Sequence, residues 1–292
     1  MDKNHAKALE DLVKSGPNLP SEINLRDPTL YHNALFAQMY DSSQPPVWDS
    51  LCEELAEEAA ITANDIVADL GCGSGRLTRY LQTKNPKKLY AIEPSTAMLK
   101  ILKERLDTQK ITIVLGSIDE LIQSGVERPN KILSSGVFSV VTDPETLLRK
   151  VYSYLPQEGI YLFTVEDWRN ANVDGEPTEM FNERFRAALK EIGMATNAPV
   201  IKANQETYTK EEVERCIQNA GGMVLKHRVK EMIHSGECAI AMLSSLLEGA
   251  AADQLPKIKG IQDIAKQFYA GKKITSGIQH TFVTTQKDLE AK

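Results

Sequence analysis

Long apolar runs, paired cysteines and a basic excess are all missing from this chain of 292 residues. No apolar run reaches the ~18 residues of a membrane-spanning helix, and the first residues lead into no apolar core of a secretory signal. The four cysteines are scattered and form no Cys-x-x-Cys pair, which argues against a zinc knuckle or a disulfide framework. We therefore expect no membrane association, no metal, reduced thiols and a cytoplasmic location.

The charge of the chain disfavours nucleic acid as a partner. The formal net charge is -6, and basic residues gather only in short stretches at Lys84–Lys88, Lys226–Lys230 and Lys272–Lys273. Nucleic-acid enzymes usually carry a longer basic stripe. With 42% hydrophobic and 25% charged residues, the composition is typical of a globular protein. We expect a small-molecule substrate and a monomer or homodimer.

The most informative segment runs from Ile66 to Gly75 and reads Ile-Val-Ala-Asp-Leu-Gly-Cys-Gly-Ser-Gly. Its apolar start has the length of a buried parallel strand, which ends in Asp69. Three glycines follow at alternate positions, and a helical pattern begins at Arg76. Glycines permit a tight turn and a close approach of a ligand to the backbone, and a helix start presents free N–H groups.

A second acid, Glu93, ends the next apolar run, Leu89–Ile92. An acid in this position can accept hydrogen bonds from both hydroxyls of a ribose, while Asp69 can accept them from a cationic amine near the glycines. A nicotinamide-binding fold is the nearest alternative, but its Gly-x-Gly-x-x-Gly fingerprint requires a later third glycine than Gly75 and gives Asp69 no role. A plain strand-to-helix turn is the other alternative.

Together, Asp69–Gly75 and Ala91–Ser95 resemble the cofactor site of class I S-adenosylmethionine-dependent methyltransferases. The resemblance covers roughly residues 60 to 165 and is greatest to the UbiE-like enzymes that act on small molecules. It implies an α/β, Rossmann-like fold with a seven-stranded, mostly parallel sheet and a helical cap. The implied cofactor is S-adenosylmethionine, with S-adenosylhomocysteine as the product of methyl transfer to O, N or C. A non-methylating protein that binds S-adenosylmethionine, or an RNA or protein methyltransferase, is the alternative.

The rest of the chain continues as alternating strands and helices. Further strands are expected at Ile111–Leu115, Asn130–Ser134, Ile160–Val165, from Met223, and at Ile274–Thr285. Ser95, Asp143 and Thr209 should cap helices, with Glu212 completing a capping box at Thr209. Asn130 stands where the family commonly has Asp.

The resemblance implies cofactor contacts from turns that follow the strands and from a segment before the core. These residues are Tyr40, Asp69, Gly71, Cys72, Gly73, Glu93, Pro94, Ser117, Ile118, Ser134 and Ser135. Ser117 departs from the family, which often has an acid there, and ordinary turn chemistry is an open alternative for Ser117 and Ile118. Tyr40 is expected over the donor, because a Tyr-Asp pair before the core is frequent in the family, and simple packing is its alternative.

The acceptor is expected near the carboxyl ends of the central strands, where open α/β sheets bind their ligands. Val137, Phe138 and Trp168 are the predicted substrate contacts. His234 and His280 are the candidate catalytic bases, with a structural or surface role as the alternative for each.

We predict an N-terminal helical lid over residues 1–55 and a methyltransferase core over residues 56–292, with cap insertions at 167–207 and 238–270. These segments carry apolar helical faces that must be buried against something. We expect them to close over the donor. Padding of the sheet edge or a dimer contact is the alternative.

Overall fold

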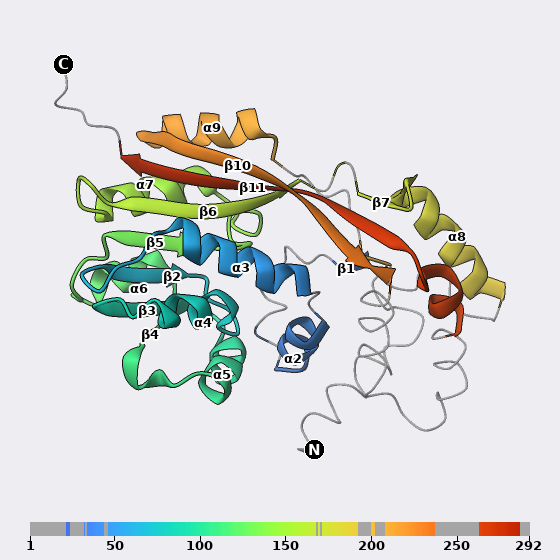
Figure 1. Ribbon diagram of the computed structural model, residues 1–292, viewed down its shortest axis with the longest axis horizontal. Coiled ribbons are helices and arrows are strands. Elements are labelled where there is room, and N and C mark those ends of the chain that lie inside the picture. Colours follow the sequence, from blue (N-terminus) through green and yellow to red (C-terminus); the bar gives the residue numbers. More distant parts are fainter. Residues whose placement is uncertain are drawn as a thin grey trace. The chain divides into compact units, whose positions relative to one another are not determined.

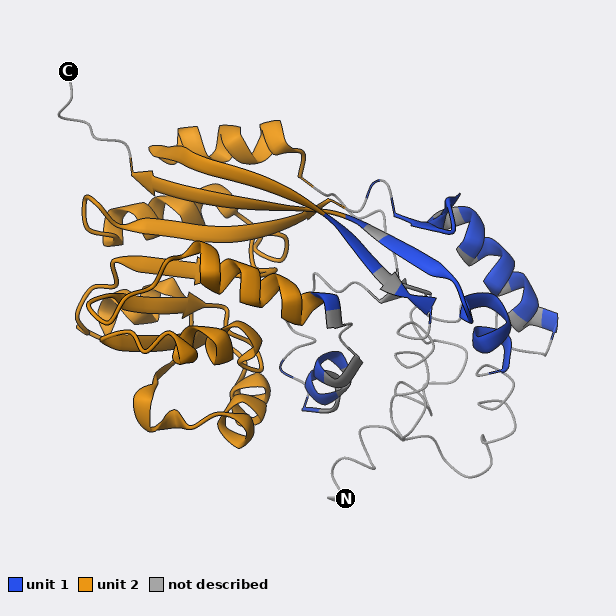
Figure 2. Cartoon of the chain, in the orientation of Figure 1, with its two compact units in different colours: residues 1–47, 168–205, 231–277 blue, residues 48–167, 206–230, 278–292 orange. Residues whose placement is uncertain are grey.

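The computed structural model describes residues 22–23, 32, 34–43, 46–167, 169, 171–191, 200–201, 208–236 and 263–286. The chain divides into two compact units (Figure 2). The first unit comprises residues 1–47, 168–205 and 231–277, and the second comprises residues 48–167, 206–230 and 278–292. The predicted boundary at residue 55 therefore differs from the observed one at 47. The reason is that helix α3, Pro46–Glu58, contributes Leu55 and Ala56 to the core of the second unit.

Seven strands form the sheet of the second unit as far as the structure describes it, in the order β4-β3-β2-β5-β6-β11-β10 (Figure 1). They are β2 Ile66–Leu70, β3 Lys88–Glu93, β4 Thr112–Leu115, β5 Lys131–Ser134, β6 Ile160–Asp167, β10 Gly222–Ser235 and β11 Lys273–Gln286. Strands β4, β3, β2, β5 and β6 are parallel, and β11 pairs with β6 in the antiparallel direction. The predicted α/β fold with a parallel sheet core is confirmed. The predicted count of seven strands is too low, because β7 Asn172–Val173 pairs with β11, and β8 Glu176–Pro177 pairs with β7, so that the described sheet has nine strands.

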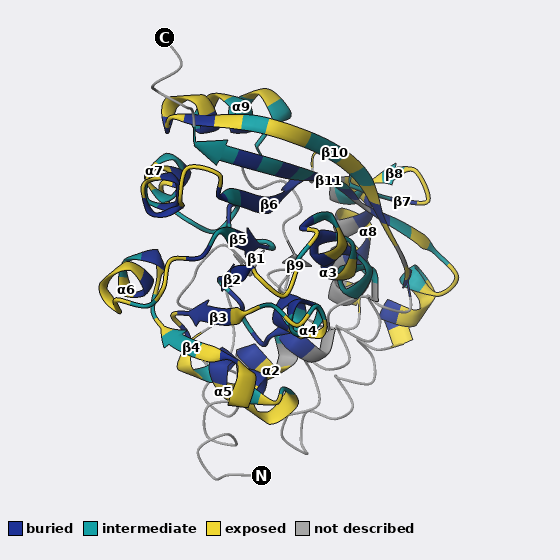
Figure 3. Cartoon of the chain, turned by 60° about the vertical axis from the view of Figure 1, so that its left-hand side comes forward, coloured by how far each residue is buried: buried dark blue, intermediate teal, exposed yellow. Residues whose placement is uncertain are grey.

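Both faces of this sheet are buried, because successive side chains of a strand point to opposite faces. In β2, Val67 joins one hydrophobic cluster and Ala68 joins the other. The cluster of Ala68 is completed by helices α6 Ile118–Gln123, α7 Pro144–Tyr154 and α9 Lys210–Asn219, and that of Val67 by α3, α4 Arg76–Thr83 and α5 Thr96–Arg105. Figure 3 shows the buried central strands between partly exposed helices. Among the described helices, none is long and apolar enough to cross a membrane.

The helix starts follow the predicted capping chemistry. Ser95 accepts a hydrogen bond from the backbone N–H of Met98, and Asp143 accepts one from that of Thr146. Thr209 forms the predicted reciprocal box at the start of α9. These three predictions are confirmed, and each cap satisfies a backbone donor that the helix itself leaves open.

The first unit contains short strands and separate helices. Its strands are β1 Glu22–Ile23, β7 Asn172–Val173, β8 Glu176–Pro177 and β9 Val200–Ile201, and its helices are α2 Ala34–Ser43, α8 Thr178–Glu191 and residues 263–269. Phe181 and Phe185 of α8 pack against Phe268 and Tyr269. Residues 238–262 of the predicted cap insertion lie outside the described residues. Closure of this unit over a donor stays a prediction.

Polar side chains join the amino ends of β2 and β5. Asn130 Nδ2 donates to Asp65 Oδ1 at 2.6 Å, and Asn130 Oδ1 accepts from the N–H of Ile66 at 2.7 Å. Lys131 Nζ lies 3.0 Å from Asp65 Oδ2. Burial raises the pKa of Asp65, but hydrogen bonds from Asn130, Thr62 and Lys131 outweigh it and lower the pKa to about 2. Asp65 is therefore a charged anchor, and an amide suits position 130 because it can donate to that charge.

Asn130→Asp should destabilise the protein at pH 7 by roughly 2–3 kcal/mol, because a second carboxylate replaces the donor to Asp65. A carboxylate with a depressed folded-state pKa stabilises the fold above its unfolded pKa, and that stability is lost as the pH falls through the folded pKa. In Asn130→Asp, protonation of one of the two carboxyl groups restores a hydrogen-bond donor. The loss in free energy of unfolding relative to the native protein should therefore shrink as the pH falls from 7 towards about 4.

Urea unfolding between pH 4 and 8 measures this difference. Asn130→Ala is the control, because it also loses the hydrogen bond to Asp65 but adds no charge. Its deficit should change little over this range. Equal deficits for the two variants at every pH would contradict the charge argument.

Candidate functional site

The glycine loop after β2 is held against the end of β3. The backbone N–H groups of Gly71 and Cys72 both donate to the carbonyl of Ile92, at 2.8 and 2.9 Å. Gly71 has a φ of +72°, and a Cβ on it would lie 2.3 Å from Cγ2 of Val137. Gly73, with a φ of +54°, has no described heavy atom within 4 Å of the corresponding position. The loop therefore packs closely at Gly71 and presents open backbone at Gly73.

Glu93, at the end of β3, connects this loop to its strand. Oε2 of Glu93 accepts from the N–H of Gly73 at 3.0 Å, and Oε1 accepts from the N–H of Ser95 at 2.9 Å. The side chain is buried. Each carboxylate oxygen has further acceptor capacity, so Glu93 can fix the loop and still accept from ribose hydroxyls. The sequence suggested the second role and did not reveal the first.

Asp69 is fully buried beneath the loop. Thr78 Oγ1 donates to its Oδ2 at 2.6 Å, and its Oδ1 has no hydrogen-bond partner among the residues that the structure describes. Burial, followed by the charge of Glu93, raises the pKa of Asp69 to about 7, against the lowering effect of the hydrogen bond from Thr78. A buried carboxylate with an open oxygen is stabilised by a nearby cation, which fits the ammonium group of S-adenosylmethionine.

The structure shows the burial and the contacts of three further residues that were predicted to bind the cofactor. Ser134 is fully buried and its hydroxyl lies 2.7 Å from that of Tyr161. The thiol of Cys72 is buried 3.8 Å from the carbonyl oxygen of Gly73, and burial raises its pKa well above the ordinary range. Pro94 is exposed between Glu93 and Ser95. The cofactor contacts predicted for these three residues stay predictions.

The structure gives Ser117 a helix-capping role in place of free turn chemistry. Its hydroxyl donates to Glu120 Oε2 at 2.7 Å and accepts from the N–H of Asp119 at 3.2 Å, and Glu120 accepts in return from the N–H of Ser117. The side chain of Ile118 is buried in the core. Both side chains are therefore committed within the fold, and a contact from either residue to an adenine ring stays a prediction.

The loop after β5 gives Phe138 a packing role, and its predicted contact with substrate stays a prediction. Phe138 is fully buried, stacked on Phe163 with ring centroids 5.2 Å apart, and in edge contact with Tyr208 at 5.1 Å. It is a core residue because its ring fills space between β6 and the segment before α9. Val137 instead lies against Gly71. Ser135 is half-buried.

Cys52 of α3 is a neighbour of the site that sequence reasoning missed. Burial, and then the charge of Asp69, raises the pKa of its thiol to about 12, although Arg76 and a hydrogen bond with Ser135 act in the opposite direction. A thiol in this state is no nucleophile near neutral pH. Its contacts place α3 beside Asp69 and the loop after β5.

Of the two histidines predicted as catalytic bases, the structure describes the side chain of His280 alone. His280 is buried on β11, with Nδ1 3.0 Å from Nε2 of His227 on β10. Burial, and then the charge of Lys210, lowers the pKa of His227. This pairing gives His280 a structural setting, and its role as a base stays a prediction. The side chain of His234 and all of Trp168 lie outside the described residues, and half-buried Tyr40 lies in α2 of the first unit.

Glu166 lies at the end of the fifth core strand, in the region where the acceptor is expected, although the sequence assigned it no contact of its own. It lies buried near the end of β6, where Ser139 Oγ donates to its Oε2 at 3.1 Å. A Cβ on Gly136 would lie 3.8 Å from its Oε1. The available sequence signal was an acid at the end of an apolar strand, the same signal that identified Glu93.

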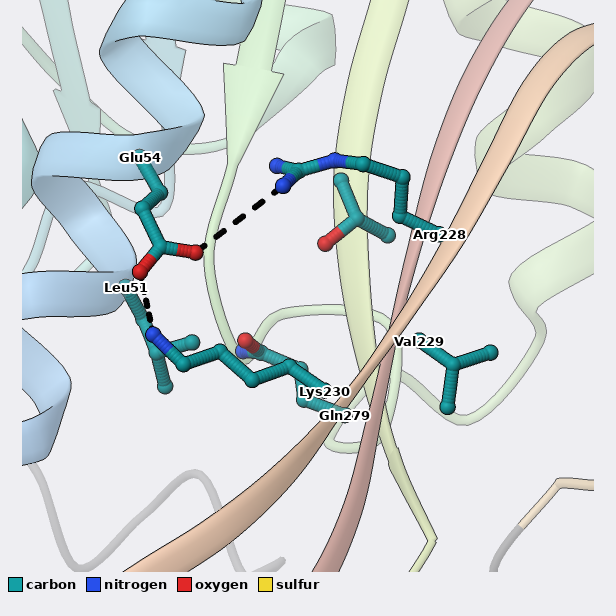
Figure 4. Close-up of a pocket in the computed structure, with 7 residues that line it drawn as sticks. Leu51, Glu54, Arg228, Val229, Lys230 and Gln279 are labelled. Atoms are coloured by element: carbon teal, nitrogen blue, oxygen red, sulfur yellow. Dashed lines mark hydrogen bonds and ion pairs between the residues drawn. The ribbon is translucent and has the colours of Figure 1, made fainter.

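Ion pairs hold α3 on two sides. Asp49 pairs with Arg76 and Arg79 of α4 at 2.8 and 2.9 Å. On the other side, Glu54 pairs with Lys230 of β10, and Figure 4 shows this pair beside Gln279. A cavity of about 10 Å³ lies between α3, β10 and β11, with room for about one water-sized group.

These observations define the class of the protein. A parallel sheet carries a buried acid and an open glycine loop after β2 and a second acid after β3, and residues 68–163 match the family model described as a methyltransferase domain. The chain carries a class I S-adenosylmethionine-dependent methyltransferase domain. The open Gly73, Glu93 and the free oxygen of Asp69 fit the family's cofactor.

The relatives extend this classification. The malonyl-[acyl-carrier protein] O-methyltransferase of Priestia megaterium is 30% identical over 166 residues, which are 56% of each chain. The enzyme of the same name from Bacillus cereus is 28% identical over 206 residues, 67% of this chain and 72% of the relative. The match thus spans little more than half of the first relative. A solved protein of Bacillus halodurans C-125 has the same fold, with a TM-score of 0.51, 14% identity and coverage of 80% of this chain and 98% of its own.

Glu93→Ala should weaken binding of S-adenosylhomocysteine by about 2–4 kcal/mol, because it removes both ribose acceptors and releases the N–H groups of Gly73 and Ser95. Glu93→Gln keeps one carbonyl oxygen, so its affinity for S-adenosylhomocysteine should lie between that of Glu93→Ala and that of the native protein. Calorimetry measures the affinity, and circular dichroism confirms folding. Unchanged affinity in folded Glu93→Ala would rule out the ribose role.

Asp69→Asn should weaken binding of the same ligand by roughly tenfold or more, through loss of a charge-assisted hydrogen bond to its ammonium. It should also stabilise the free protein at pH 8. Because folding raises the pKa of Asp69 to about 7, the folded state binds its proton more tightly, and stability falls as the pH rises from about 4 to about 7.

Asp69→Asn has no carboxyl group at this position, so it does not lose this stability as the pH rises. The difference between its thermal unfolding midpoint and that of the native protein should therefore grow between pH 5 and pH 8. Thr78→Ser keeps the hydroxyl that donates to Asp69 and serves as the control. A difference in midpoint that is independent of pH would show that Asp69 bears no buried charge.

Proposed function

We propose that this protein transfers a methyl group from S-adenosylmethionine to a small molecule. The observation that carries the proposal is the open backbone at Gly73, which Glu93 holds in place, above the buried carboxylate of Asp69. The donor supplies an activated methyl group on a sulfonium. The residues of the chain then need to bind the donor, orient it and bring the acceptor into line with it.

The electrostatics of the site support this donor over a dinucleotide. Asp69 and Glu93 are both buried acids, and each raises the cost of the other's charge. A cation offsets this cost, whereas a pyrophosphate adds to it. Gly75 has a packing role, because a Cβ on it would lie 2.9 Å from Cγ of Leu102. The third glycine thus serves contact between the loop and α5.

A small-molecule acceptor is supported by those relatives that are named malonyl-[acyl-carrier protein] O-methyltransferase or probable fatty acid methyltransferase, and by the net charge of -6. Two shorter matches, over 56 and 76 residues, are to enzymes named ribosomal RNA small subunit methyltransferase A. An acidic chain is a poor match for RNA. The proposal includes a cytoplasmic location, which the free thiols of Cys52, Cys72 and Cys216 support. It also includes a monomeric or homodimeric state. A protein that binds the donor without methylating remains the second candidate.

Methyl transfer should be detected by incubating the protein with methyl-labelled donor and a cell extract. We expect S-adenosylhomocysteine to accumulate and the label to enter the fraction that passes an ultrafiltration membrane. Gly71→Ala is the control, because its Cβ would meet Val137 at 2.3 Å and displace the loop. Label in RNA or protein would identify a different acceptor class, and donor binding without turnover would favour the non-methylating candidate. Binding of NAD in place of both S-adenosyl compounds would refute the proposal.

A further inference from the structure

Two buried polar residues face each other at the end of the sheet beside the donor loop. Glu166 of β6 and Gln279 of β11 are direct partners in the antiparallel register. Partners in such a pair lie on the same face of the sheet with neighbouring Cβ atoms. Their exposed fractions are 5% and 1%. Burial of an acid and an amide together at the edge of a hydrophobic core requires polar partners.

Glu166 is connected to the donor loop through the segment that follows β5. Ser139 donates to its carboxylate at 3.1 Å, and Gly136 lies against the same carboxylate. The next residue, Val137, contacts Gly71 of the donor loop. Gly136 is itself fixed, because its N–H donates to Thr164 Oγ1 at 3.1 Å. One short segment therefore separates Glu166 from the donor loop.

Gln279 provides an independent observation. Its Nε2 is buried and has no hydrogen-bond partner among the residues that the structure describes. A buried donor without an acceptor is unfavourable, so this amide favours binding of an acceptor oxygen. Gln279 also lines the cavity of about 10 Å³ next to Leu51 and Thr281 (Figure 4). The cavity has room for about one water-sized group, which matches a single oxygen atom.

The charges around Glu166 and Gln279 determine which methyl acceptors can bind there. Asp69, Glu93 and Glu166 are buried acids at this end of the sheet. Among the described residues, three neighbouring cations are already engaged by acids. Arg76 pairs with Asp49, Lys230 pairs with Glu54, and Arg228, which lines the same cavity as Gln279, pairs with Glu58 at 2.7 Å. A carboxylate or phosphate brought to this site would meet like charge in a poorly solvated place. A neutral hydroxyl avoids that repulsion and can donate to one of these acids.

We infer that Glu166 and Gln279 select a neutral hydroxyl compound, an alcohol or phenol, as the methyl acceptor. The acceptor O–H donates to the carboxylate of Glu166, and the same oxygen accepts from Nε2 of Gln279. Glu166 takes the O–H proton as the oxygen gains the methyl group, so that the products are a methyl ether and S-adenosylhomocysteine. The two contacts fix the direction of the oxygen's remaining lone pair, which is what in-line attack requires. This assignment rests on the proposed methyl transfer and adds the chemical class of its acceptor.

The test uses three small probes of similar shape with the protein saturated with S-adenosylhomocysteine. Phenol can donate and accept, anisole can only accept, and benzoate is anionic. Chemical-shift titration of ¹⁵N-labelled protein should show phenol binding at least about fivefold more tightly than anisole or benzoate, the factor expected for one hydrogen bond. The side-chain amide signals of Gln279, assigned by their loss in Gln279→Leu, should shift with phenol.

Two substitutions and two matched controls complete the experiment. Glu166→Gln and Gln279→Leu should each weaken phenol binding by about fivefold or more, with S-adenosylhomocysteine affinity kept within about twofold. Glu104→Gln and Gln218→Leu, at exposed positions of α5 and α9, should change neither affinity. Benzoate binding as tightly as phenol, no detectable phenol binding, or phenol binding insensitive to both substitutions would overturn the inference and leave the methyl transfer proposal standing. Failure to bind S-adenosylhomocysteine would instead overturn the proposed function itself.

Discussion

The hydrogen bonds that the Glu93 carboxylate accepts from the backbone N–H groups of Gly73 and Ser95 are the constraint on which the site depends. Both bonds are charge-assisted. The bond from Gly73 joins the end of β3 to the glycine loop after β2, so it fixes the separation of two neighbouring strand ends, while the bond from Ser95 fixes the turn after β3. The loop can then expose Gly73 to a ligand without losing its shape. Ser95 goes on to cap α5, so the same contact also sets where that helix begins.

The site concentrates negative charge in a place that water reaches poorly. Burial, and then the charge of the neighbouring Glu93, raises the pKa of Asp69 to about 7. Such a group lowers the stability of the free protein at neutral pH and is stabilised when a cation arrives. The acids at the strand ends thus favour a sulfonium donor, and they do so at some expense to the fold. Ion pairs on both sides of α3 hold that helix beside these acids.

Local signals in the sequence predicted most of the architecture. Short apolar runs ending in Asp69 and Glu93, and capping residues such as Ser95 and Thr209, all act through neighbours a few positions away, so the sequence displays them directly. The sequence did not reveal the direction in which a side chain points, so it did not predict the contacts of Phe138 and Ser117. Phe138 follows β5 as a substrate contact would, but its ring turns into the core against Phe163. Ser117 stands in a turn that a cofactor could meet, yet Glu120 engages it in a capping box.

The sequence by itself determined the class of the protein, because the glycine loop and the two acids act through spacing within one short stretch of chain. It also determined where the helices start, through side-chain contacts with the next turn of backbone. Only the tertiary structure decided which distant residues share the site. Glu166 meets Gln279, and Asn130 meets Asp65, through strand register, which depends on the packing of the whole sheet. The burial that shifts the pKa of Asp69 likewise exists only once helices cover both faces of that sheet.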